Sequence, residues 1–197
     1  MTIRDATPSD APFLAKCVLA GLHLYDFESE IPKNKERFQR LTECEQRNDL
    51  LYSYCNSRVA EVDGRSVGSI LSYPGEIYKE LRRRTFSELL SDFTALDTDS
   101  EQETGPGEFY LDSMAVLPSY RGCGIGRALM QDSIQRGISL GYNKITLLVD
   151  PEMPSLISLY SSIGFTLDGC CHAFGVDFRK MVYVNNNQKV YFCHPKF

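Results

Sequence analysis

The sequence predicts an α/β (α+β) fold, and three observations support this prediction. Strand-like and helix-like segments alternate along the 197 residues. A nearly continuous apolar run at residues 144–149 is typical of a buried strand. A loop with three glycines in five residues, at 122–126, joins a strand-like run at 108–117 to a helix-like run at 125–140. We therefore expect the strands and helices to build one α/β domain.

The N-terminal region begins with a short strand followed by an amphipathic helix. Residues 2–6 have strand character, and Thr7 is a suitable N-cap because a proline and then an acid follow it within three residues. Leu14, Val18 and Leu22 recur every fourth residue, which predicts a helix with one apolar face.

A β-hairpin is predicted around Asp63-Gly64, because strand-like runs at 57–62 and 66–73 flank this turn signal. The remaining expected elements are a helical piece around Phe38 and Leu41, a helical stretch within 76–93, a helix at 154–163, strands at 165–174 and 178–184, and an extra C-terminal hairpin strand at 189–193.

Composition restricts the class of protein. With 197 residues, 43% of them hydrophobic, we expect a single domain over 1–197. The net charge of −5 argues against a nucleic-acid partner. No run of 18 apolar residues and no leader pattern is present, so we expect a cytoplasmic protein without a membrane partner. Seven scattered cysteines indicate free thiols and predict no metal site.

The glycine-rich loop predicts a phosphate-bearing ligand. At a helix start, unpaired N–H groups and the helix dipole favour an anion, and glycines let it approach closely. The phosphate loop of nucleotide triphosphatases requires a lysine after Gly126, but Arg127 stands there. A dinucleotide fold requires different glycine spacing and more chain downstream, although Asp150 resembles its ribose-binding acid. A dinucleotide-binding enzyme therefore remains an alternative.

Two motifs resemble those of the GNAT superfamily of acetyl-CoA-dependent N-acetyltransferases. The pyrophosphate loop pattern [RQ]-x-x-G-x-[GA] reads here Arg121, Gly124 and Gly126, after a strand end with Pro118. The family's L-Y-x-x-x-G-F pattern reads Leu159 to Phe165. The resemblance implies a central mixed, mostly antiparallel twisted sheet flanked by helices on both faces. It also implies transfer of an acetyl group from acetyl-CoA to a primary amine, by direct attack in a ternary complex.

The resemblance also implies the residues that bind coenzyme A. The loop is expected to hold the pyrophosphate through main-chain N–H groups and arginine charge, and the central strand is expected to meet the pantetheine arm. The expected coenzyme A contacts are Met114, Ala115, Val116, Arg121, Gly122, Cys123, Gly124, Ile125, Gly126 and Arg127. The main-chain N–H of Met114 is the candidate donor to the oxyanion.

Catalysis of amine acetylation requires a base for the amine proton and an acid for the leaving thiolate. Strand alternation places Tyr110, Asp112, Met114 and Val116 on one face, so we prefer Asp112 over Glu108 as the base. One bulge would reverse these faces. Tyr160 stands at the family's proton-donor position.

Residues 75–107 form an insertion of a helix and an acidic loop, relative to the short turn usual in GNAT proteins. Beside the site it would cover the substrate, and its carboxylates, Glu103 among them, would favour a cationic acceptor. A solvated loop without a role is equally consistent.

The acceptor is expected to be a small-molecule or peptide amine, and a homodimer is left open. Met153 stands where the family often has asparagine, so a catalytically silent acyl-CoA-binding module remains an alternative.

Overall fold

The computed structural model describes residues 1–22, 25, 27, 35–89, 102–173 and 175–186. Its centre is one open sheet built from β1 (Thr2–Asp5), β2 (Ser57–Val62), β3 (Arg65–Pro74), β4 (Glu108–Val116), β5 (Lys144–Val149), β6 (Thr166–Ala173) and β7 (Val176–Val184). The strands lie in the order β1-β2-β3-β4-β5-β7-β6. Strands β4 and β5 are parallel, whereas the other neighbouring pairs are antiparallel.

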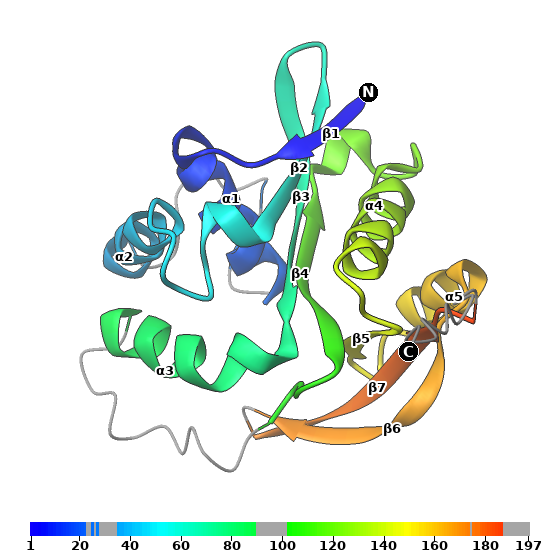
Figure 1. Ribbon diagram of the computed structural model, residues 1–197. Helices are drawn as coiled ribbons and strands as arrows, with labels where there is room; N and C mark the ends of the chain where they lie inside the picture. Colours follow the sequence, from blue (N-terminus) through cyan, green and yellow to red (C-terminus); the bar gives the residue numbers. More distant parts are fainter. Residues whose placement is uncertain (23–24, 26, 28–34, 90–101, 174, 187–197) are drawn as a thin grey trace, which may run out of the picture.

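Helices cover both faces of this sheet (Figure 1). They are α1 (Ala11–Gly21), α2 (Lys35–Glu45), α3 (Tyr78–Leu89), α4 (Ile125–Ser139) and α5 (Pro154–Ile163). Helices α1, α2 and α3 lie on one side, and α4 and α5 lie on the other. The predicted mixed, mostly antiparallel sheet with helices on both faces is confirmed. Among the described helices, none combines the length and the apolar character that crossing a membrane requires.

Local sequence signals fix several of these elements. The Thr7 capping box is present ahead of α1. Asp63 and Gly64 have φ angles of 51° and 76°, as a tight hairpin turn between β2 and β3 requires. Strand β5 and helix α5 match their predicted bounds. The predicted strand at 189–193 and the acidic positions 90–101 lie outside the described residues.

A large hydrophobic core lies on each face of the sheet, and a smaller cluster contains Ala6, Leu14 and Val59. The core beneath α4 contains Phe109 and Leu111 of β4 together with Leu129 of the helix. The core beneath α1, α2 and α3 contains Tyr110 of β4 and Tyr73 of β3. Adjacent residues of β4 thus enter opposite cores, which is the alternation expected of a strand covered on both faces.

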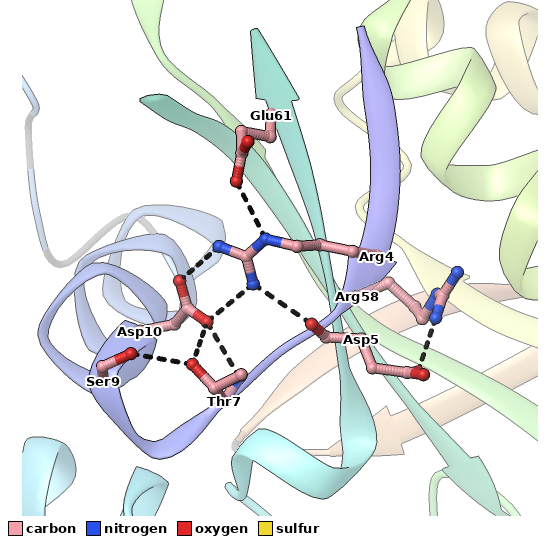
Figure 2. A network of polar contacts seen from close by, with 7 residues as sticks. All are labelled: Arg4, Asp5, Thr7, Ser9, Asp10, Arg58 and Glu61. Carbon is pink, nitrogen blue, oxygen red and sulfur yellow. Dashed lines mark hydrogen bonds and ion pairs between the residues drawn. The ribbon is translucent and has the colours of Figure 1, made fainter. Parts of the chain in front are cut away.

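An ion-pair network fastens β1 to the start of α1 and to β2 (Figure 2). The Arg4 guanidinium donates two hydrogen bonds of 2.8 Å to Asp10 and one of 2.9 Å to Glu61. Asp10 also accepts from the main-chain N–H of Thr7 at 2.8 Å. The bonds from Arg4 lower the pKa of Asp10 to about 2, so this carboxylate stays ionised at neutral pH.

Strands β4 and β5 pair only over the first part of their length. Their pairing runs from Glu108–Lys144 to Leu111–Leu147, and both strands continue beyond that point without pairing to each other. The parallel hydrogen-bond ladder therefore opens into a wedge between the second half of β4 and the end of β5.

A β-bulge in β4 coincides with the start of this wedge. Ile70 of β3 pairs with Met114 and Ser72 pairs with Leu111, so Asp112 and Ser113 together oppose a single residue of β3. The extra residue reverses the alternation from that point onward.

The prediction that Tyr110, Asp112, Met114 and Val116 share one face of β4 is therefore wrong. Tyr110 packs into the core beneath α1 to α3, and Asp112 bonds to Tyr73 of the same core. Met114 and Val116 instead pack against the core beneath α4. The physical reason is the bulge, which local alternation in the sequence does not reveal.

Candidate active site

A cavity of about 660 Å³ lies where β4 and β5 part. One side is formed by residues at the end of α1, by α2 and α3 and by Glu103; the other is formed by the end of β5 and by α5, with Tyr160. The bulged part of β4 lies between these sides. It contributes Asp112, which bonds to Tyr73 of the core beneath α1 to α3, to the first side, and Met114, which packs against the core beneath α4, to the second. The cavity therefore passes through the sheet and joins residues of both faces.

The glycine-rich loop lies at the start of α4. Gly122 and Gly124 have φ angles of 76° and 81°, in the left-handed region that favours glycine. Arg121 to Gly124 are exposed, and α4 has no side-chain cap at its N-terminus. The first N–H groups of α4, from Ile125 onward, therefore remain available to an anion, as binding of a pyrophosphate requires.

Both arginines of the loop have partners within the chain. The guanidinium of Arg121 donates to the carbonyl of Val116 at 3.1 Å. The guanidinium of Arg127 donates to the hydroxyl of Ser162, in α5, at 2.7 Å. Arg121 thus fastens the loop to the end of β4, and Arg127 fastens α4 to α5. Cys123 is an exposed thiol.

The predicted contacts on β4 divide into two groups. Met114 lines the cavity, whereas Ala115 and Val116 do not. The side chains of Met114 and Val116 reach the first turn of α4, because a Cβ built on Gly126 would lie 3.6 and 3.9 Å from their nearest atoms. Gly126 therefore allows α4 to pack closely against the end of β4.

Tyr160 lines the cavity on the α5 side. Its ring is half-buried and lies 6.3 Å from that of Phe165. Burial raises the pKa of its hydroxyl above the usual value of 10, so the hydroxyl stays protonated at neutral pH.

Asp112 lines the cavity although the bulge puts it on the opposite face of β4 from Met114. One carboxyl oxygen accepts from the hydroxyl of Tyr73 at 2.5 Å, and the other accepts from the hydroxyl of Ser113 at 2.6 Å. Burial raises the pKa of Asp112 above its usual value, against the opposing effect of these two hydrogen bonds. The bulge thus brings Asp112 and Met114 to the same cavity from opposite faces of the sheet.

Glu108, the other predicted base, does not line the cavity. Its carboxylate accepts from the ammonium of Lys180 at 2.8 Å and from the hydroxyls of Thr104 and Thr146 at 2.9 and 3.2 Å. Burial raises the pKa of Glu108, but these hydrogen bonds and the charge of Lys180 outweigh that effect and lower it. An ionised, fully engaged carboxylate outside the cavity is suited to anchoring rather than to accepting a proton from a substrate.

Comparison with known proteins identifies the family. The model of the acetyltransferase (GNAT) family matches residues 20–165. The chain belongs to the GNAT acetyltransferase family. A mycothiol acetyltransferase from Thermobispora bispora is 36% identical over 75 residues, which are 38% of this chain and 25% of that relative. The match thus spans only about a quarter of the length of the curated relative.

Solved acetyltransferase structures share the whole fold. One is 28% identical, with a TM-score of 0.74, covering 93% of this chain and 99% of the other. An N-acetyltransferase from Staphylococcus aureus is 24% identical, with a TM-score of 0.75, covering 92% and 100%. A protein from Salmonella typhimurium, solved with its cofactor acetyl-CoA, is 18% identical, with a TM-score of 0.57, covering 93% of both chains. The last two comparisons concern the fold alone.

The structure of this GNAT acetyltransferase brings to the site one carboxylate of the insertion, which the sequence named only as one member of an acidic group. Glu103, at the end of the predicted insertion, lines the cavity. Its carboxyl oxygens accept from the hydroxyls of Tyr78 and Tyr110 at 2.7 and 2.9 Å. Burial and the nearby charge of Asp112 raise the pKa of Glu103 to about 7. No local signal in the sequence distinguishes Glu103 from the acidic residues that precede it.

A third carboxyl, Glu45, is buried at the end of α2 and does not line the cavity. It is 0% exposed, and within the described part of the chain neither of its carboxyl oxygens has a hydrogen-bond partner. Burial, with a further contribution from the charge of Asp112, raises the pKa of Glu45 to about 8. A protonated Glu45 at neutral pH leaves Asp112 without an additional negative neighbour.

Glu45 generates a prediction about stability. Its folded-state pKa lies above the unfolded value, so its contribution is fully present below about pH 4.5 and is lost as pH rises toward 8. Glutamine does not titrate. Glu45→Gln should therefore become more stable relative to the native chain by about 3 kcal/mol between pH 5 and pH 8, as measured by urea unfolding.

The matched control is Glu43→Gln, an exposed position on the same helix. We expect it to change the free energy of unfolding by less than about 0.5 kcal/mol at either pH. A Glu45→Gln difference that stays constant between pH 5 and pH 8 would contradict this account of the buried carboxyl.

Proposed function

We propose that this chain is an acetyl-CoA-dependent N-acetyltransferase that acts on a primary amine by direct attack in a ternary complex. The observation that carries the proposal is that Tyr160, on one side, and the carboxyls of Asp112 and Glu103, on the other, line the same cavity. Such an arrangement offers a protonated hydroxyl and proton-accepting carboxyls on opposite sides of one reaction space.

Coenzyme A fits the residues present. The uncapped, glycine-rich start of α4 suits its pyrophosphate, with Gly122 to Gly126 supplying main-chain N–H groups. The wedge between β4 and β5 suits its extended amide-bearing arm, because the main-chain groups of the two strands that face the wedge do not hydrogen-bond to each other. Met114, Ala115 and Val116 are the main-chain partners we propose for the arm, and the N–H of Met114 for the acetyl oxygen.

The reaction requires two proton movements. The amine nitrogen bonds to the acetyl carbon and loses a proton, for which Asp112 is the proposed acceptor. Its raised pKa supports this role, because a base with a pKa nearer to neutrality accepts a proton more readily. The bond from the acetyl carbon to sulfur breaks, and the departing thiolate takes a proton from Tyr160. Glu108 is left out of this scheme because of its ion pair with Lys180.

A catalytically silent acyl-CoA-binding module and a dinucleotide-binding enzyme would behave differently. The silent module would bind acetyl-CoA and release no coenzyme A when an amine is supplied. A dinucleotide enzyme would bind NAD in preference to acetyl-CoA. Calorimetry with both ligands, followed by a chromatographic assay for coenzyme A release, separates the three functions.

The loop generates a prediction about cofactor binding. Alanine at the φ of 81° of Gly124 costs roughly 1–2 kcal/mol in local conformation and displaces the N–H groups at the start of α4. We expect Gly124→Ala to weaken acetyl-CoA binding by about tenfold, measured by calorimetry.

Gly141→Ala is the matched control for Gly124→Ala. Gly141 follows the other end of α4 with a φ of 95°, and a Cβ there would also have no neighbour within 4 Å. It carries similar backbone strain away from the loop, so its acetyl-CoA affinity should equal that of the native chain. Equal losses of affinity in both variants would remove the loop from the proposed cofactor site.

Tyr160→Phe tests the proposed acid. Removing the hydroxyl should lower kcat by about 10² while the dissociation constant of acetyl-CoA changes less than twofold. Tyr183→Phe is the control, because Tyr183 packs 5.9 Å from the same Phe165 ring but does not line the cavity. Unchanged turnover in Tyr160→Phe would exclude this tyrosine as the proton donor.

A further inference from the structure

We propose that Glu103 and Asp112 together bind the amine nitrogen of the acceptor, and that the acceptor is an apolar monoamine with an alkyl or arylalkyl substituent. This inference rests on the proposed function and assigns its substrate class. It concerns the described side of the cavity formed by α1, α2, α3 and Glu103, opposite Tyr160.

Glu103 is held in place by a cluster of tyrosines. The ring of Tyr73 lies 6.3 Å from that of Tyr78 and 5.7 Å from that of Tyr110. Tyr78 and Tyr110 donate their hydroxyl hydrogens to Glu103, and Tyr73 donates to Asp112. Three contiguous rings therefore orient two carboxyls that line one cavity.

The backbone next to Glu103 is fastened to the sheet. The carbonyl of Gly105 approaches Gly75 so closely that a Cβ at Gly75 would lie 2.0 Å from it. Thr104 is buried and donates to Glu108, whose own main-chain N–H donates back to Gly105 at 3.2 Å. The ion pair of Glu108 with Lys180 thus anchors the start of β4, and Thr104 and Gly105 link the segment that contains Glu103 to it.

The electrostatic environment suits an ammonium group. The charge of Asp112 makes ionisation of Glu103 less favourable, and the pKa of about 7 at Glu103 reflects burial first and this charge second. Arg82, buried nearby with its guanidinium over the rings of Tyr78 and Phe86, opposes this effect. A substrate ammonium would relieve the repulsion between the two carboxylates through charge-assisted hydrogen bonds.

The rest of this side of the cavity is apolar. Its walls include Leu19 of α1, Leu41 of α2, Tyr52, and Phe86 and Leu89 of α3. Among the described lining residues on this side, Glu103 and Asp112 are the acidic ones and Arg37 is the basic one. A second ammonium or several hydroxyls on the acceptor would face these apolar walls or Arg37, at a desolvation cost. An alkyl or aryl group would instead gain from burial.

The test compares four probes in one assay for coenzyme A release: phenethylamine, spermidine, glucosamine and phenethyl alcohol. We expect phenethylamine to have a kcat/KM at least tenfold above spermidine and glucosamine, and phenethyl alcohol to give no release. Glu103→Gln should raise the KM for phenethylamine at least tenfold and change the dissociation constant of acetyl-CoA less than twofold.

The control is Glu80→Gln, an exposed position of α3 that pairs with Arg84 and does not line the cavity. It should leave KM and acetyl-CoA affinity unchanged. The double variant Tyr78→Phe/Tyr110→Phe removes both hydrogen bonds to Glu103 and keeps the rings. It should also raise KM, and it replaces Glu103→Gln as the test if thermal melting shows that Glu103→Gln does not fold.

The outcomes separate this inference from the proposed function. Faster turnover of spermidine or glucosamine, or an unchanged KM in Glu103→Gln, would overturn the inference and leave an N-acetyltransferase. Acetyl-CoA binding without coenzyme A release from any amine, or no acetyl-CoA binding, would overturn the proposed function itself.

Discussion

The parting of β4 from β5 is the constraint on which the rest of the site depends. Parallel pairing stops at Leu111 and Leu147, and the bulge at Asp112 and Ser113 begins at that point. The opening exposes strand edges to an extended ligand, while the bulge brings a carboxyl and an apolar side chain to the same cavity. Without either feature, the two faces of the sheet would remain separate.

Three carboxyl groups are buried on the α1–α3 side of the sheet. Glu45, Glu103 and Asp112 all have raised pKa values, chiefly through desolvation. Natural folds avoid such groups unless they are paired or used. Glu103 and Asp112 are hydrogen-bonded and line the cavity, whereas Glu45 is fully buried and does not line it. This difference distinguishes carboxyls that can exchange a proton with a substrate from one that holds its proton.

Local signals in the sequence predicted the elements, and long-range contacts determined the site. Gly124, Asp63-Gly64 and the run at 144–149 fixed a helix start, a turn and a buried strand, because each depends on neighbouring residues. The bulge in β4 depends on packing between whole strands, so alternation placed Met114 on the wrong face. Glu108 is 72 residues from Lys180, its ion-pair partner, and no local sequence pattern predicts that contact. The same holds for Glu103 and its tyrosines.

The central claim is that one cavity through the sheet holds the acetyl donor and the amine acceptor on opposite sides. A crystal structure with coenzyme A joined covalently to phenethylamine through an acetyl linker tests it most directly. We predict that the pantetheine arm lies between β4 and β5 with the sulfur near Tyr160, and that the nitrogen lies within hydrogen-bonding distance of Asp112 or Glu103. An arm bound outside the wedge, or a nitrogen directed away from both carboxyls, would contradict the account.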